Sequence, residues 1–259
     1  MLFRLYIGIS KIGRYSLKKV IFFGEAMMFL SLTIFGSVRI RSIIKQMNNI
    51  GVQSIIIISV SALFIGFVLG LQGYYTLAKF SAQSALGPMV ALSIIKELGP
   101  VITALLVAGR SGSALTSEIG LMKTTEQLSS LSMMGVDPIR FIIAPRFWAG
   151  IICMPLLNII FCAIAIYGGY LVGVKILGLY YGTFWGNMQA NLLPQDIING
   201  IIKSIVFGIA VTCTSIYQGY ACRPDSEGIA KATTKTVVYS SLLILGLDFI
   251  LTAIMFKGL

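Results

Sequence analysis

Four ionisable residues stand inside otherwise apolar segments, namely Lys96, Glu97, Lys203 and Asp248, and their formal charges cancel. A charge at the centre of a membrane helix costs about 2.5–3.5 kcal/mol on insertion scales, so such residues pair or line a polar pathway. Lys203 and Asp248 fall at similar depths of consecutive antiparallel segments, which predicts an ion pair between them. Neighbours on a helix point roughly 100° apart, so Lys96 and Glu97 are expected to find other partners.

The segment that carries Lys96 and Glu97 is interrupted by proline. Pro88 and Pro100 bracket the two charges, and each proline follows a glycine. Proline removes a backbone donor and kinks a helix, and freed backbone at membrane depth is tolerated where it is buried in protein or lines a cavity. A charged pair on such a helix predicts a polar cavity.

The first apolar segment ends in polar residues. Gly66 and Gly70 form a G-x-x-x-G pattern that permits close helix packing, and Gln72 and Tyr75 follow it. Side chains at this depth can meet a lipid headgroup, and the ordinary anchoring of tyrosine at the membrane interface is the alternative.

The composition indicates a membrane protein without a catalytic site of its own. The 259 residues are 57% hydrophobic and 11% charged, against about 25% charged in soluble domains. The chain has no histidine, which excludes Ser-His-Asp catalysis and His-ligated zinc. It also has no G-x-x-x-x-G-K-[ST] motif for a nucleotide phosphate. We therefore predict no enzyme activity and no cofactor in this chain.

Five apolar stretches are long enough to cross a bilayer, which needs roughly 20 residues. They cover residues 52–71, 86–108, 147–174, 197–217 and 237–256. The stretch 20–38 is a possible sixth, but Glu25 interrupts it and both of its flanks are basic. We predict an all-α membrane protein with an interfacial helical region over 1–45 and a transmembrane domain over 46–259.

The positive-inside rule decides between five and six spans. With five spans and a cytoplasmic N-terminus, fifteen Lys and Arg residues lie inside and three lie outside. With six spans the division becomes eight against ten. The first division predicts a cytoplasmic N-terminus, a periplasmic C-terminus and a basic amphipathic helix along the inner leaflet.

The longest predicted cytoplasmic loop contains a helix-like run. Thr124 and Gln127 have the spacing of a capping box, and Leu128, Leu131 and Met134 recur on one face before a Gly-Val-Asp-Pro sequence ends the run. Such a helix can pack on its own bundle or dock a cytoplasmic partner.

Long ungapped motifs in this chain resemble those of the MlaE permease family. The first are GFVLGLQGY at 66–74 and KELGPVITALLVAGR at 96–110, and the resemblance continues in order almost to the C-terminus. The later stretches are 111–123, TEQLS at 125–129, VDP at 136–138, APRFWA at 144–149, GIAKATTKTVV at 228–238 and LGLDFILTAIM at 245–255.

The resemblance implies an ABC transporter of the bacterial inner membrane that moves phospholipid between the inner and outer membranes and maintains outer-membrane lipid asymmetry. In this family two permease copies pair, and a cytoplasmic ATPase (MlaF) with a STAS-domain protein (MlaB) docks on them. A periplasmic ring of MCE domains (MlaD) completes the complex. ATP and Mg²⁺ are then expected in the ATPase, phospholipid is the expected substrate, and no nucleic acid is expected as a partner.

The resemblance also implies roles for particular residues. A coupling helix is implied over 118–134, with ATPase-coupling residues Glu118, Lys123, Glu126, Leu128 and Leu131. Substrate-binding residues near a pocket at the dimer interface are implied at Gln72, Tyr75, Lys96 and Glu97. Family sequences often have arginine in place of Lys96, and lysine keeps the charge but loses the planar fork that suits phosphate.

An ion-coupled secondary transporter is the alternative function. Lys96, Glu97 and Asp248 would then act as a charge relay, and a proton or sodium gradient would drive transport without ATP. The inverted repeat that such folds often carry is not evident in the sequence.

Overall fold

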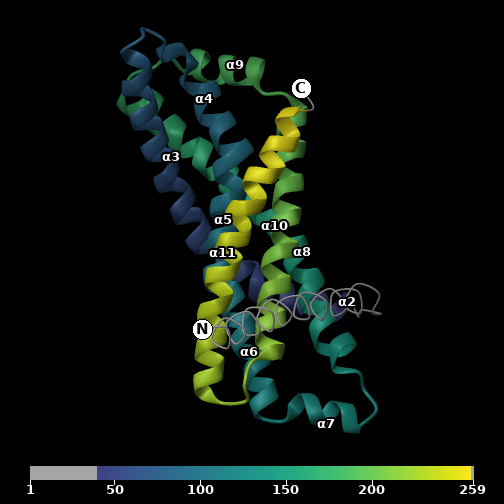
Figure 1. Cartoon of the computed structure of the whole chain (residues 1–259). Coiled ribbons are helices and arrows are strands. Elements are labelled where there is room, and N and C mark those ends of the chain that lie inside the picture. Colours follow the sequence, from purple (N-terminus) through teal and green to yellow (C-terminus); the bar gives the residue numbers. More distant parts are fainter. Residues whose placement is uncertain (1–39, 258–259) are drawn as a thin grey trace, which may run out of the picture.

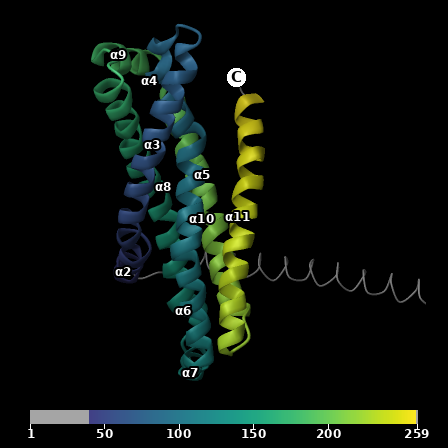
Figure 2. The same cartoon turned by 90° about the vertical axis from the view of Figure 1, so that its left-hand side faces the viewer.

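The computed structural model describes residues 40–257, and this part of the chain is helical with no strand. Five of its helices are long and apolar enough to cross a membrane. They run side by side along one axis (Figures 1 and 2). The expectations for 1–45 and for the stretch 20–38 fall almost entirely outside the described residues.

The five long helices extend past the apolar stretches that predicted them. The first is α3 (Ile55–Ala78), and the fourth and fifth are α10 (Pro194–Ala221) and α11 (Ser226–Lys257). The second consists of α4 (Leu86–Ser93), α5 (Gly99–Val107) and α6 (Ser113–Thr124), and the third is α8 (Ala144–Tyr170) with a π-helical turn at each end. Hydropathy marks the part of a helix inside hydrocarbon, whereas backbone hydrogen bonding continues into the polar interface.

Three short helices run across the direction of the long ones. In Figure 1, α9 (Tyr181–Asn191) lies at the end that carries the C-terminus, and α7 (Gln127–Met133) lies at the opposite end. The third is α2 (Ile40–Ile50), which packs against α8. Because α2 continues through residues 45 and 46, the expected domain boundary falls within a helix.

Close packing of α3 on α8 depends on small residues. A Cβ atom at Gly66 would lie 2.1 Å from the Ala165 carbonyl oxygen, and one at Gly70 would lie 3.0 Å from the Gly169 carbonyl oxygen. The G-x-x-x-G pattern therefore faces a neighbouring helix, where it allows the two backbones to approach. The opposite face of α3 remains uncovered.

The helix expected over 118–134 is two helices. α6 ends at Thr124, and α7 begins at Gln127 after Glu126, whose φ of 56° is left-handed. The capping box expected from Thr124 and Gln127 is also wrong, because the Thr124 hydroxyl donates to the Gly120 carbonyl within α6. The chain turns at this left-handed residue, and α7 then runs across the end of the bundle (Figure 1).

Candidate functional site

Lys96 and Glu97 lie on a π-helical turn, Ile94–Leu98, within the second long helix. The turn is followed by Gly99 and Pro100. Pro100 has no N–H, so the Lys96 carbonyl cannot receive the usual α-helical hydrogen bond from residue 100. The freed carbonyl accepts a hydrogen bond from a side chain of α10.

That side chain is Lys203, which is 2% exposed. Its ammonium donates to Asp248 Oδ1 at 2.9 Å, the pairing that the sequence predicts, and to Glu97 Oε2 at 3.0 Å. The Lys96 carbonyl oxygen at 2.9 Å and the Thr252 hydroxyl oxygen at 2.7 Å are further acceptors within hydrogen-bonding distance, so four acceptors share the three N–H groups of the ammonium. Thr252 Oγ1 lies in turn 3.3 Å from Glu97 Oε1. One buried ammonium thus connects the second, fourth and fifth long helices.

Lys96 points to a different partner, Asp196, with 2.8 Å between Nζ and Oδ1. Asp196 is buried in the first turn of α10, where its Oδ2 also accepts the Leu193 N–H at 3.2 Å. Asp196 falls between the apolar stretches 147–174 and 197–217, so the sequence predicts a loop residue there and no partner for Lys96. A carboxylate in the first turn of a helix satisfies free N–H groups, but this accounts only for the contact with Leu193.

With Asp196 included, the charges of the cluster no longer cancel. Two lysines meet three carboxylates, and these five residues are Lys96, Glu97, Asp196, Lys203 and Asp248. Removing one partner of a buried ion pair is costly, because it leaves an uncompensated charge in a medium of low polarity. We refer to these residues as the charge cluster.

A polar cavity of about 350 Å³ adjoins the charge cluster. Lys96, Glu97, Asp196 and Lys203 contribute to its wall, together with residues of α10 and α11. The polar cavity predicted beside Lys96 and Glu97 is therefore present in the structure.

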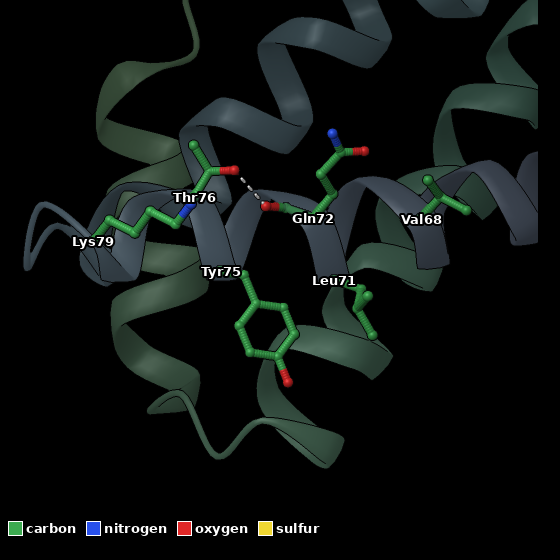
Figure 3. A pocket seen from close by; sticks show the side chains of 6 residues that line it. All are labelled: Val68, Leu71, Gln72, Tyr75, Thr76 and Lys79. Atoms are coloured by element: carbon green, nitrogen blue, oxygen red, sulfur yellow. Dashed lines mark hydrogen bonds between the residues drawn. The ribbon is translucent and has the colours of Figure 1, made fainter.

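Gln72 and Tyr75 lie elsewhere, on the uncovered face of α3. They line a shallow hollow of about 400 Å³, shown in Figure 3, whose wall comes from α3 alone. We call it the α3 hollow; its lining residues are Val68, Leu71, Gln72, Tyr75, Thr76 and Lys79. The resemblance implies one lipid pocket for four residues. Within this chain, Gln72 and Tyr75 line the α3 hollow, whereas Lys96 and Glu97 line the polar cavity, and the two share no residue.

Two of the five expected ATPase-coupling residues bind other helices of their own chain. Glu118 accepts a hydrogen bond from Arg146 of α8 at 2.6 Å, and Arg146 is almost completely buried. The Lys123 ammonium donates to the Tyr220 and Cys222 carbonyls at 2.8 Å each, at the end of α10. These side chains connect α6 with α8 and α10.

Two further expected coupling residues attach α7 to the rest of the bundle through apolar contacts. Leu128 is buried in a core with Ile143 and Phe147, and Leu131 packs against that core. Glu126 is exposed at the start of α7. The large exposed apolar side chains at the other end of α7 are Met133 and Met134, at 81% and 68%. The sequence predicts that Met134 shares one face with Leu128 and Leu131, but the two leucines pack on the core and Met134 is exposed. No sequence pattern indicated Met133.

Arg110 is a further residue with a structural role, which no sequence pattern indicated. It lies on the π-helical turn Ala108–Gly112 and donates to Ser54 Oγ at 2.7 Å and to Gln53 Oε1 at 2.6 Å. It also donates to the Asn49 carbonyl at 3.3 Å. Arg110 therefore fixes the corner between α2 and α3 against the second long helix.

Within residues 40–257, no group of three or more Cys, Asp or Glu side chains is placed to hold a metal ion. Long apolar helices around a paired charge cluster, with a polar cavity beside it, define a multi-pass α-helical membrane protein.

Comparison with known proteins gives the family. Residues 43–254 match the family described as Permease MlaE. The Haemophilus influenzae protein named intermembrane phospholipid transport system permease protein MlaE is 56% identical over 96% of this chain and 97% of its own length. A probable ABC transporter permease protein of Rickettsia bellii is 40% identical over 83% of this chain and 83% of its own length. One of Synechocystis sp. is 32% identical over 92% of this chain and 90% of its own length. The chain belongs to the MlaE permease family.

Proposed function

We propose that this chain is the permease subunit of an ATP-driven transporter that moves phospholipids between the inner and outer membranes of a bacterium. The observation that carries the proposal is the 56% identity, over nearly the full length, to a permease of an intermembrane phospholipid transport system. In this role the transporter maintains the lipid asymmetry of the outer membrane.

The proposed orientation has the α7 end of the bundle in the cytoplasm. Arg140, Arg146, Arg223 and Lys231 belong to the loops and helix ends on that side of the chain, as the positive-inside rule requires. The C-terminus and α9 are then periplasmic, next to an MCE-domain ring of the MlaD kind.

We further propose that α7 is the docking element for a cytoplasmic ATPase of the MlaF kind, which carries a STAS-domain protein of the MlaB kind. Met133 and Met134 present flexible apolar side chains away from the bundle, and methionine adapts well to a partner surface. ATP and Mg²⁺ belong to that partner in the proposed complex, since this chain has no phosphate-binding loop.

A second copy of this chain completes the proposed lipid path. The spans differ in how much of their most apolar 18-residue stretch is buried inside the bundle. The buried share is 11% for the span of α11 and 28% for that of α3, against 39–44% for the other three spans. Figure 2 shows α11 at the edge of the bundle. Uncovered faces of this kind suit helix–helix association, and a second copy would close the α3 hollow, whose wall comes from one helix.

In the proposed mechanism, closure of the ATPase pair moves α7, and the contacts of α6 pass the motion to the spans. Glu118 transmits it to α8 through Arg146, and Lys123 transmits it to the end of α10. Movement of α10 reaches the charge cluster through Lys203. The cavity between two permease copies would then narrow and move lipid toward the periplasmic ring.

The test is copurification of the ATPase with tagged permease in mild detergent. Met133→Glu places a charge on the proposed docking surface without touching the core, so we expect the ATPase to be lost while the permease stays folded. Ile176→Glu is the control, because Ile176 is 71% exposed in the turn after α8, at the other end of the bundle. Equal recovery of the ATPase with both variants, or no ATPase with the unaltered chain, would refute the docking role of α7.

A further inference from the structure

The cation expected to meet a lipid phosphate already has a partner. Lys96 forms an ion pair with the buried Asp196 at 2.8 Å. An ammonium held by a carboxylate offers little net charge to a second anion. The α3 hollow contains another cation.

Lys79 lies at the end of α3 and lines the α3 hollow. In Figure 3 its side chain runs back along the helix toward Thr76. No hydrogen bond or ion pair joins this side chain to another group among residues 40–257. The hollow contains no acidic residue, so Lys79 gives its lining a formal charge of +1. Its charge is therefore available to a ligand.

The α3 hollow changes in polarity along its length, as a phospholipid does. Val68 and Leu71 lie toward the middle of the helix, whereas Thr76 and Lys79 lie at its end. Lys79 is eleven positions after Val68, which is roughly 16 Å at the helical rise. Acyl chains would lie against the apolar part, and a headgroup phosphate would then reach Lys79 at the membrane interface.

We infer that Lys79 is the contact for the lipid phosphate in the α3 hollow, and that it makes this hollow favour phospholipids with a net negative headgroup. This inference rests on the proposed function. In phosphatidylethanolamine the ammonium offsets the phosphate charge, and the hollow has no carboxylate to receive that ammonium. Phosphatidylglycerol keeps its net charge of −1, so it gains more from Lys79.

The experiment measures lipid retained by the purified transporter complex after incorporation into nanodiscs of equimolar phosphatidylglycerol and phosphatidylethanolamine. Lipids are extracted after detergent exchange and quantified by mass spectrometry. The variants are Lys79→Gln, which removes the charge, and Lys79→Arg, which keeps it. The control is Lys175→Gln, because Lys175 is also exposed in the turn that follows a span but does not line the α3 hollow.

We expect the unaltered complex and the Lys79→Arg and Lys175→Gln variants to retain an excess of phosphatidylglycerol. In Lys79→Gln this excess should fall roughly fivefold, the factor that corresponds to about 1 kcal/mol for one lysine near an anionic lipid surface. Lipid retained in the same ratio by Lys79→Gln would overturn the inference, because Lys79 would then be only an interfacial anchor. Absence of retained phospholipid from the unaltered complex would instead count against the proposed function.

Discussion

Lys203 holds the charge cluster together, because its buried ammonium contacts carboxylates from two other spans. Asp248→Ala would leave that ammonium with Glu97 as its remaining carboxylate. Removing one partner of a buried pair costs up to about 3–5 kcal/mol, so we expect a clear loss of thermal stability in detergent. Adding Lys203→Met should recover part of that loss, although Glu97 is then unpaired.

Glu227→Ala is the matched control for this cycle. Glu227 pairs with Lys231 on the surface of α11, where both side chains are more than two-thirds exposed. Exposed pairs contribute about 0–1 kcal/mol, so the melting temperature should hardly change. The cycle also needs the single variant Lys203→Met. If the stability losses of the two single variants simply add in the double variant, Lys203 and Asp248 do not interact.

The charge cluster was predictable in part. The Lys203–Asp248 contact follows from depth alone, because both residues lie inside consecutive apolar segments. The partner of Lys96 was not predictable, since Asp196 precedes the apolar run of α10 and a π-helical turn sets the direction of the Lys96 side chain. A carbonyl without its helical hydrogen bond was expected near Pro100. Which side chain donates to that carbonyl depends on how the spans pack.

The substitution Gly66→Ala tests whether small residues determine how closely α3 packs on α8. A Cβ at Gly66 would meet the backbone of Ala165 at 2.1 Å, so Gly66→Ala must push the two helices apart. Overpacking of this kind costs about 1–3 kcal/mol, and we expect a lower melting temperature.

Gly186→Ala in α9 is the control for this substitution, because nothing lies within 4 Å of the added methyl group. Alanine is favoured over glycine inside a helix by up to about 1 kcal/mol, so this variant should be at least as stable as the unaltered chain. Equal melting temperatures for the two variants would contradict the close approach of α3 and α8.

The connection between α6 and α10 gives a prediction about coupling. Lys123 binds two carbonyls at the C-terminal end of α10, where a cation contributes about 0.3–1 kcal/mol. Lys123→Met should therefore change stability little and leave ATPase binding at α7 intact, while fewer lipids move per ATP hydrolysed. Lys123→Arg should restore much of the ratio.

Lys235→Met serves as the control for coupling, because Lys235 is an exposed lysine of α11 that makes no such contact. Both activities are measured on the same proteoliposomes. An unchanged ratio of lipid to ATP in Lys123→Met would show that this contact does not carry the motion of α6 to α10.

The helices themselves were largely predictable, and their ends were not. Apolar runs located all five spans, because the bilayer demands a nearly uninterrupted apolar stretch of a fixed length. The division of 118–134 into α6 and α7 depends on the left-handed conformation of Glu126, which the sequence does not indicate. The resemblance alone assigned Glu118 and Lys123 to ATPase coupling. Both side chains contact other helices of their own chain, and their role in coupling stays a prediction.

Considered as a whole, the molecule has two ends with proposed roles and a charge cluster within the bundle. The α7 end exposes Met133 and Met134, the opposite end holds Lys79 beside the α3 hollow, and the charge cluster joins three spans between these ends. Composition predicted that the chain lies in a membrane, and the missing phosphate-binding loop predicted that its energy comes from another subunit. The uncovered faces of α3 and α11 became evident only from the packing of the helices.

The most direct test of this account is phospholipid transfer by the reconstituted complex of this chain with its ATPase in sealed vesicles. The account predicts that transfer requires ATP and continues after ionophores collapse the proton and sodium gradients. Transfer driven by an imposed ion gradient in the absence of ATP would contradict it, and would favour a charge relay through Lys96, Glu97 and Asp248.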